Sequence, residues 1–188
     1  MRMAVRSGRH HGSRSTDEHG MMTIMDAAQI TAALDDVFDH AIVFHGFTDY
    51  MRDYDVFIYA TADPRTGPRP EYLRYRFKYC VRATVDSAVP PDVWARSLDE
   101  RLVDYETGRE LDGYVWGTRW QCLYPGARLV GDSAEATAWS TRLGLPFHEA
   151  RIETNGHNLT MVFSDLQVDA VEAGLAPFVV PDDGSAHT

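Results

Sequence analysis

The stretch YLRYRFKYCVRATV, residues 72–85, constrains the fold more than any other part of the sequence. Apolar and aromatic residues alternate there with cationic and polar residues, and successive side chains of a β-strand point to opposite faces. The alternation therefore predicts one long strand with a dry face and a cationic face. The cationic face carries Arg74, Arg76, Lys78 and Arg82.

Hydrophobic periodicity predicts helices on either side of this segment. Residues 30–38 place apolar side chains at helical spacing, with Phe38 on the buried face and Thr23 or Asp26 as the cap. Pro90 and Pro91 are suited to open a short second helix. A third helix runs to about residue 143, with Asp132 and Glu135 at the spacing of a capping box and Gly144 as its stop signal.

Further β-rich segments cover residues 40–46, 53–62 and 114–124. Residues 147–168 are typical of a hairpin, in which Asn155-Gly156 predicts a type I′ turn. Adjacent strands with irregularly placed helices predict an α+β fold, with a mainly antiparallel sheet of about five to six strands and two to three helices packed on it. We expect a disordered tail over 1–22, a single domain over 23–172 and a loose C-terminal tail over 173–188.

The balance of acidic and basic residues restricts the kinds of partner that the chain can bind. Residues 23–188 hold 14 basic and 26 acidic residues, a net charge of −12. A domain with this much negative charge repels phosphate backbones, and we therefore expect no nucleic-acid partner. The negative charge serves either to keep the protein soluble or to attract a basic protein partner. No apolar run is long enough to span a membrane, and the basic N-terminus lacks the apolar region of a secretory signal, so we expect a cytoplasmic protein. Cys80 and Cys122 fit two reduced thiols in that compartment, with one disulfide as the alternative.

The segment VFHGFTDYMRDYDVFIY, residues 43–59, contains the candidate catalytic or metal-binding residues His45, Asp49 and Asp53. On a helix these side chains would line one face, but the surrounding residues indicate two strands and a turn, in which the three side chains diverge. The structural alternative is that Asp53 and Asp55 neutralise cations such as Lys78 and Arg82 across neighbouring strands.

Two other surfaces are candidate binding sites. The cationic face formed by Arg74, Arg76, Lys78 and Arg82 is suited to a carboxylate or phosphate, or else it is paired with the aspartates. The aromatic side chains of 114–124, with Trp116 and Trp120 as candidate partner-binding residues, either form an exposed platform or pack against a helix.

Catalytic signatures are sparse. GDSAEA, residues 131–136, matches only the first letters of a serine-hydrolase motif, and Asp132 and Ser133 are equally suited to cap a helix. His148 is a further candidate base, and His157 lies beside the same hairpin. No nucleotide-binding or zinc-binding spacing is present, so we expect no cofactor and no metal.

The phrases FHGFTDYMRDYDV, WQCLYPG, FHEARIET and LTMVFSDL resemble the YxiG-like proteins of actinobacteria. This resemblance implies no catalytic residues, and by analogy with genes near a contact-dependent toxin it favours an immunity or interaction role. The expected function is therefore a protein-binding module, of toxin-neutralising type in its most specific form. The alternative is an enzyme or small-ligand binder that recognises an anionic compound on the cationic face.

Overall fold

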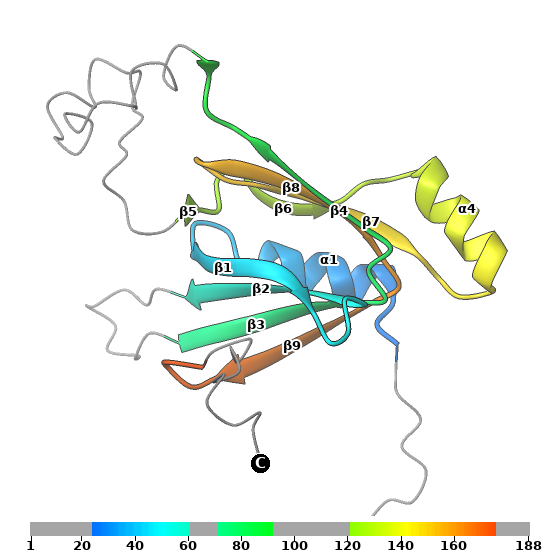
Figure 1. Ribbon diagram of the computed structural model, residues 1–188, viewed down its shortest axis with the longest axis horizontal. Helices are drawn as coiled ribbons and strands as arrows, with labels where there is room; N and C mark the ends of the chain where they lie inside the picture. The colour runs from blue at the N-terminus through cyan, green and yellow to red at the C-terminus, as the bar shows by residue number, and fades with distance from the viewer. Residues whose placement is uncertain (1–23, 61–70, 92–120, 176–188) are drawn as a thin grey trace, which may run out of the picture.

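The computed structural model describes residues 24–60, 71–91 and 121–175 (Figure 1). These residues form two helices and nine strands. In chain order they are α1 (Ala27–Asp35), β1 (Ala41–Thr48), β2 (Asp53–Ala60), β3 (Glu71–Lys78), β4 (Arg82–Ser87), β5 (Gln121–Cys122), β6 (Gly126–Leu129), α4 (Ala134–Leu143), β7 (His148–Glu153), β8 (His157–Phe163) and β9 (Asp165–Val171). Neither helix is long and apolar enough to cross a membrane.

The strands form two antiparallel sheets. The five-stranded sheet has the order β5-β1-β2-β3-β9, and the four-stranded sheet has the order β4-β8-β7-β6. Every pair of neighbouring strands is antiparallel. The expected α+β class is confirmed, with more strands than the five to six anticipated and with a division into two sheets.

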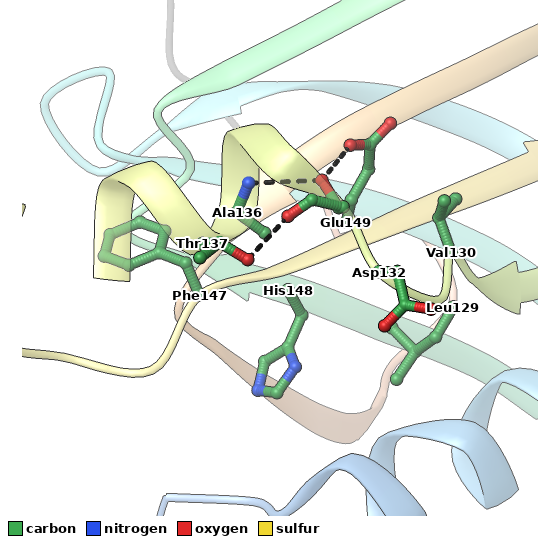
Figure 2. Close-up of a pocket in the computed structure, with 9 residues that line it drawn as sticks. Leu129, Val130, Asp132, Ala136, Thr137, Phe147, His148 and Glu149 are labelled. Carbon is green, nitrogen blue, oxygen red and sulfur yellow. Dashed lines mark hydrogen bonds between the residues drawn. The ribbon is translucent and has the colours of Figure 1, made fainter. Parts of the chain in front are cut away.

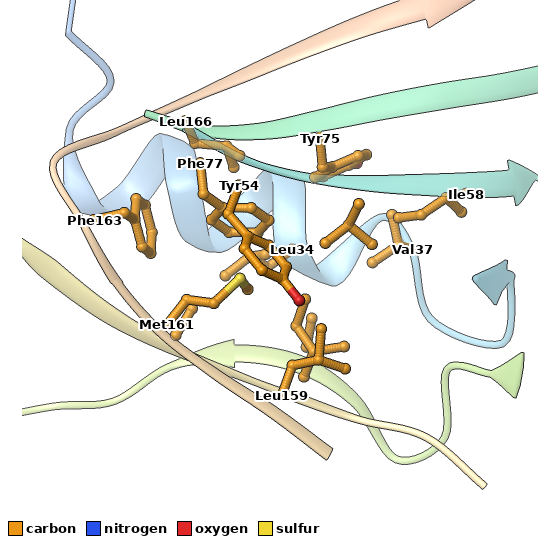
Figure 3. Packing of buried hydrophobic residues seen from close by; sticks show 14 of the residues in the cluster. Leu34, Val37, Tyr54, Ile58, Tyr75, Phe77, Leu159, Met161, Phe163 and Leu166 are labelled. Carbon is orange, nitrogen blue, oxygen red and sulfur yellow. The ribbon is translucent and has the colours of Figure 1, made fainter. Parts of the chain in front are cut away.

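Helix α1 lies between the two sheets and completes their shared core (Figures 1 and 3). Ile30, Leu34 and Val37 project into this core, as their helical spacing predicts. The ring of Phe77 on β3 meets that of Phe163 on β8 edge to face, with centroids 4.8 Å apart. The Tyr75 hydroxyl donates a hydrogen bond of 2.9 Å to the carbonyl of Ala33, which ties the helix to β3.

The single long strand predicted over 72–85 is wrong. The chain leaves the five-stranded sheet after Lys78 and enters the four-stranded sheet at Arg82. Tyr79 adopts a left-handed backbone with φ of 51°, which no continuous strand permits. The side chain of Tyr79 is consequently 44% exposed, whereas that of Cys80 is buried. The positions 72–85 thus belong to two strands in different sheets.

A second crossing lies beside the first. The predicted hairpin over 147–168 contains β7 and β8, but after Ser164 the chain continues as β9 in the five-stranded sheet. The amide of Ser164 donates to the carbonyl of Lys78, and the amide of Val81 donates to the carbonyl of Val162. The two crossings are therefore held together by backbone hydrogen bonds.

Local turn and cap predictions had mixed outcomes. Asp26 caps α1 in a capping box with Gln29, and Gly144 ends α4 in the left-handed conformation, as predicted. Ser133, not Asp132, is the N-cap of α4. The Asn155-Gly156 turn is not type I′, because neither residue has a positive φ. The Thr154 hydroxyl orders this turn instead, by accepting hydrogen bonds from the amides of Gly156 and His157.

Several predictions fall outside the described residues. These are the N-terminal tail, most of the C-terminal tail, the helix that Pro90 and Pro91 were expected to open, and the strand 114–124 apart from its last four residues.

Candidate binding sites

A cavity of about 240 Å³ lies where α4 begins, between the end of β6 and the start of β7 (Figure 2). Its walls combine apolar residues with two acidic residues and the hydroxyl residues Ser133 and Thr137. The lining residues are Leu129, Val130, Asp132, Ser133, Ala136, Thr137, Phe147, His148 and Glu149. The sequence marked Asp132, Ser133 and His148, but it gave no sign that Glu149 joins them.

The Ser133 hydroxyl is committed to structural hydrogen bonds. It donates to Oε2 of Glu149 and accepts from the amide of Ala136 at 3.1 Å (Figure 2). A serine nucleophile needs its oxygen free to attack, whereas this oxygen accepts from an amide in the first turn of α4. The arrangement fits a helix cap anchored to β7, which is the structural interpretation of GDSAEA.

His148 points away from Glu149, on the opposite face of β7 (Figure 2). Its ring lies 6.0 Å from that of Phe163, centroid to centroid. Burial lowers the pKa of His148, with an opposing and smaller effect from Asp165. The imidazole therefore belongs to the side of the sheet that faces the core, and the geometry forms no serine–histidine pair.

Arg82 lies on the outer face of the four-stranded sheet. Its Nε is 2.9 Å from Oε2 of Glu135, and its Nη2 is 3.3 Å from Oε1 of Glu149. These contacts join α4 to β4 and β7, and the small cluster of Ala136, Phe147 and Val162 packs beside them. Arg82 is thus separated from Arg74 and Arg76, and the predicted four-residue cationic face does not exist as one surface.

Arg74 and Arg76 lie on the face of the five-stranded sheet that points away from α1, where they converge on Asp55. Arg74 Nε donates to Oδ2 of Asp55 at 2.8 Å, and the Thr48 hydroxyl donates to the same oxygen at 2.9 Å. Arg76 Nε lies 3.8 Å from Oδ1 of Asp55, beyond hydrogen-bond distance. Cross-strand neutralisation was predicted for Asp53 and Asp55. For Asp55 the structure shows it, with Arg74 and Arg76 of the predicted cationic face as the cations, whereas Arg82 lies on the other sheet.

Asp55 is 0% exposed, so its carboxylate is removed from water. Removing water from a carboxylate costs several kcal/mol, which only nearby cations and donors can offset. Because Asp55 is so placed, it stabilises the fold only while both arginines remain in position.

Replacing Asp55 with Asn should lower the free energy of unfolding by roughly 3 kcal/mol, since two half-buried guanidinium groups lose their counter-charge. The matched control is Asp49→Asn, which removes a carboxylate from the exposed pair with Arg52 at 3.5 Å and should cost less than about 1 kcal/mol. Urea denaturation followed by circular dichroism measures both. Equal effects of the two substitutions would contradict the buried role of Asp55.

His45, Asp49 and Asp53 do not converge. His45 faces the core side of β1, Asp49 lies in the β1–β2 turn, and buried Asp53 accepts a hydrogen bond of 3.0 Å from the amide of Tyr79. In the part of the chain that the structure describes, no group of three or more His, Cys, Asp or Glu side chains is placed to hold a metal ion.

His45 instead belongs to a polar cluster between the sheets. Its Nδ1 and the Tyr54 hydroxyl share a hydrogen bond of 2.7 Å. Nearby, Gln121 Nε2 donates to Nδ1 of His157 at 2.9 Å. Burial, and secondarily the charge of His157, lower the pKa of His45, and burial raises the pKa of Tyr54 to about 12. Both groups are thus held neutral at physiological pH.

The lowered pKa values of His45 and His148 predict a pH-dependent stability. The unfolded chain binds protons at these histidines near pH 6.5 and the folded chain only at lower pH, so stability is full above pH 6.5 and is lost as the pH falls below it. Chemical denaturation between pH 7.5 and 5.5 should show a smaller loss in His45→Gln and in His148→Gln than in the parent chain. An unchanged slope in both variants would contradict the burial of these imidazoles.

The described residues contain both cysteines, and both are free thiols. Burial raises the pKa of Cys80 to about 12, and burial together with Asp39 raises the pKa of Cys122. Neither thiol has the lowered pKa that marks a reactive cysteine.

An exposed aromatic pair lies at the junction of α1 and β6, where the sequence did not indicate one. Phe38 is 54% exposed, although periodicity placed it in the core, and Tyr124 is 63% exposed. Their ring centroids are 6.0 Å apart. We call this pair, together with the carboxylates of Asp35, Asp36 and Asp39, the acidic aromatic patch.

The three carboxylates of this patch gather at the C-terminal end of α1. All three residues are exposed, and the last turn of the helix contains no basic residue. Among the described residues they form no ion pair, although the Cys122 thiol donates to Asp39 at 3.3 Å. Negative charge at this end of a helix opposes the helix dipole and is unfavourable. The described residues therefore leave the negative charge of this patch without a cationic partner.

The candidate partner-binding residues Trp116 and Trp120 lie outside the described residues. Phe38 with Tyr124 is one exposed aromatic pair among the described residues, and Trp139 of α4 packs beside Phe147.

The fold and these sites define a small α+β protein with two antiparallel sheets around a central helix, an acidic aromatic patch and a shallow cavity at the start of α4. A family model for YxiG-like protein matches residues 26–181. The chain belongs to the YxiG-like family. Searches of curated proteins and of solved structures each found no significant match.

Proposed function

We propose that this chain is a protein-binding module that docks a basic partner on its acidic aromatic patch. The observation that carries the proposal is the exposure of Phe38 and Tyr124 beside three carboxylates that form no ion pair with any described residue. Aromatic side chains with a polar rim are typical of the residues that supply most of the energy in protein interfaces.

Charge complementarity identifies the kind of partner. The patch is acidic, and the chain from residue 23 onward has a net charge of −12. A basic protein surface is therefore attracted at long range and oriented toward the patch, whereas a nucleic acid is repelled.

A toxin-neutralising role in the bacterial cytoplasm is the most specific form of this proposal. A toxin that acts on nucleic acid needs a basic surface to bind phosphates, and an acidic patch with an aromatic anchor would cover such a surface. The toxin-neutralising role specifies the class of the partner, and the identity of the protein captured in the crosslinking experiment below tests it.

The alternative is a ligand-binding or enzymatic role on the face that carries Arg74 and Arg76. It is supported by Arg76 Nε, which is buried and has no hydrogen-bond partner in the described residues. Against it, Asp55 already provides a counter-charge to both arginines.

A photo-crosslinking amino acid at position 124 should capture one basic protein from cells of the source organism, because Tyr124 lies within the proposed interface. The matched control is the same group at Tyr50, which is 91% exposed in the turn at the far end of β1. Capture from both positions, from neither, or of an acidic protein would contradict the proposal.

With the captured protein in hand, Phe38→Ser with Tyr124→Ser should weaken binding by about 30-fold or more, because each is an aromatic anchor. The control pair Tyr50→Ser with Met51→Ser should change affinity by less than about threefold. Raising the salt concentration should also weaken binding of the parent chain. Binding measurements on the immobilised chain give the affinity of each variant. An unfolding curve for each variant then separates loss of the contact from loss of the fold.

A further inference from the structure

Strand β4 forms one edge of the four-stranded sheet, and among the described residues it has a neighbouring strand only on its β8 side. Just beyond β4, the amide of Ala88 donates to the carbonyl of Gly156, which continues the β4–β8 register as a hydrogen-bonded pair. Such pairs alternate with non-hydrogen-bonded pairs along an antiparallel ladder. The even-numbered residues of β4 therefore direct their amides and carbonyls toward β8, whereas Ala83 and Val85 direct theirs toward the open edge.

The sequence of β4 suits pairing with a strand of the same sequence. An open strand edge is a template for another strand unless proline, an unmatched charge or a covering segment prevents the pairing. β4 contains no proline, and the side chain of Val85 is 44% exposed beside the edge. The two charged residues of β4, Arg82 and Asp86, have opposite signs and lie at equal spacing on either side of Thr84. A second copy of β4 that runs antiparallel therefore brings each charge opposite its counter-charge.

One antiparallel register between two copies of β4 matches every opposed pair from Arg82 to Asp86. A two-fold axis between the Thr84 residues of the two copies gives the opposed pairs Arg82 with Asp86, Ala83 with Val85, and Thr84 with Thr84. Ala83 and Val85, whose backbone groups face the open edge, then hydrogen-bond across the axis, and their apolar side chains meet. A register shifted by two residues in either direction opposes Thr84 to a charged residue and loses both charge pairs.

The charged side chains are placed to meet in this register. Arg82, Thr84 and Asp86 share the outer face of the sheet, because side chains alternate along a strand. Arg82 contacts Glu135 and Glu149 through Nε and Nη2, and a guanidinium has further donors on its other terminal nitrogen. Asp86 is exposed and forms no ion pair with any described residue. A second copy thus supplies Asp86 with a cation that the described part of its own chain does not.

We infer that two copies of this chain pair antiparallel through β4, about a two-fold axis at Thr84, which joins their four-stranded sheets into one continuous sheet. The net charge of −10 opposes self-association at long range, so the pairing is weak and strengthens when salt screens that repulsion. The outer strand β9 of the other sheet is less suited, because it carries two aspartates and no cation. The inference goes beyond the proposed function, because none of the five residues of the acidic aromatic patch lies on β4.

Thr84→Cys tests the register, because the non-hydrogen-bonded pair at the axis places the two Cα atoms about 4.5 Å apart, within the range of a disulfide. In a Cys122→Ser background, which leaves only the buried native thiol, mild oxidation of Thr84→Cys should give a disulfide-linked dimer. The matched control is Thr160→Cys, which lies beside Thr84 on β8, one strand away from the axis, and should stay monomeric. No dimer from Thr84→Cys, equal yields from the two variants, or a faster dimer from Val85→Cys would overturn the inference.

Sedimentation equilibrium of the parent chain should show a reversible monomer–dimer equilibrium. Val85→Pro should abolish the dimer, because proline lacks the amide that faces the open edge but leaves the hydrogen bonds to β8 in place. The control Val85→Thr keeps that amide and should dimerise within about threefold of the parent chain. An unfolding curve for each variant confirms that the fold is kept. A parent chain that is monomeric at every concentration, or a dimer of equal strength in Val85→Pro, would overturn the inference.

Asp86→Arg tests the charge pairs through an exposed side chain, and it decides the matter if Val85→Pro fails to fold. It places like charges opposite each other at both ends of the pairing and should weaken the dimer by about tenfold or more. The control Glu172→Arg makes the same change of charge at an exposed site after β9 and should leave the dimer as strong or stronger, because the net charge falls. Equal effects of the two variants would overturn the inference.

The dimer and the proposed function can fail separately. Phe38→Ser with Tyr124→Ser should leave the monomer–dimer equilibrium unchanged, because neither residue lies on β4. Asp86→Arg should in turn leave crosslinking from position 124 unchanged. Loss of the dimer in Phe38→Ser with Tyr124→Ser would place the contact at the acidic aromatic patch and overturn the assignment to β4.

Discussion

The contact between Phe77 and Phe163 joins the two sheets, and the remainder of the structure depends on it. Both side chains are 0% exposed and meet edge to face. Immediately after each of them the chain crosses to the other sheet, through residues 79–81 after β3 and through Ser164 after β8. Because the crossings also share backbone hydrogen bonds, neither can move without displacing the other.

This double crossing determines where charge is placed. It keeps Arg74 and Arg76 on the five-stranded sheet, where they offset the buried charge of Asp55, and carries Arg82 to the four-stranded sheet. There Arg82 contacts Glu135 and Glu149 and so helps to fix the first turn of α4. The cavity at that turn and the acidic aromatic patch at the end of α1 are consequences of the same framework.

The sequence was sufficient for elements whose signals are local. The apolar spacing of residues 30–37, the Asp26 cap and the Gly144 stop each depend on a few neighbouring residues, and each agrees with the structure. The alternation over 72–85 is also local, but it specifies only which side chains share a face. It contains no information on which sheet a strand joins, so the break at Tyr79 was missed.

The candidate sites were harder to foresee for the same reason. Phe38 continues the apolar period of α1, but the helix ends at Asp35, and Phe38 is left exposed beside Tyr124. Glu149 reaches Ser133 only because the end of β6 and the start of β7 meet at the first turn of α4. These contacts arise from tertiary packing, which short-range sequence patterns do not reveal.

The most direct test of this account is the set of cross-strand proton contacts on either side of Tyr79, measured by nuclear Overhauser spectroscopy. The account predicts contacts of Tyr75 with Val56 and Val168, contacts of Ala83 with Met161, and ring contacts between Phe77 and Phe163. Contacts that pair residues 82–85 with β2 or β9 would show one continuous strand and would contradict it.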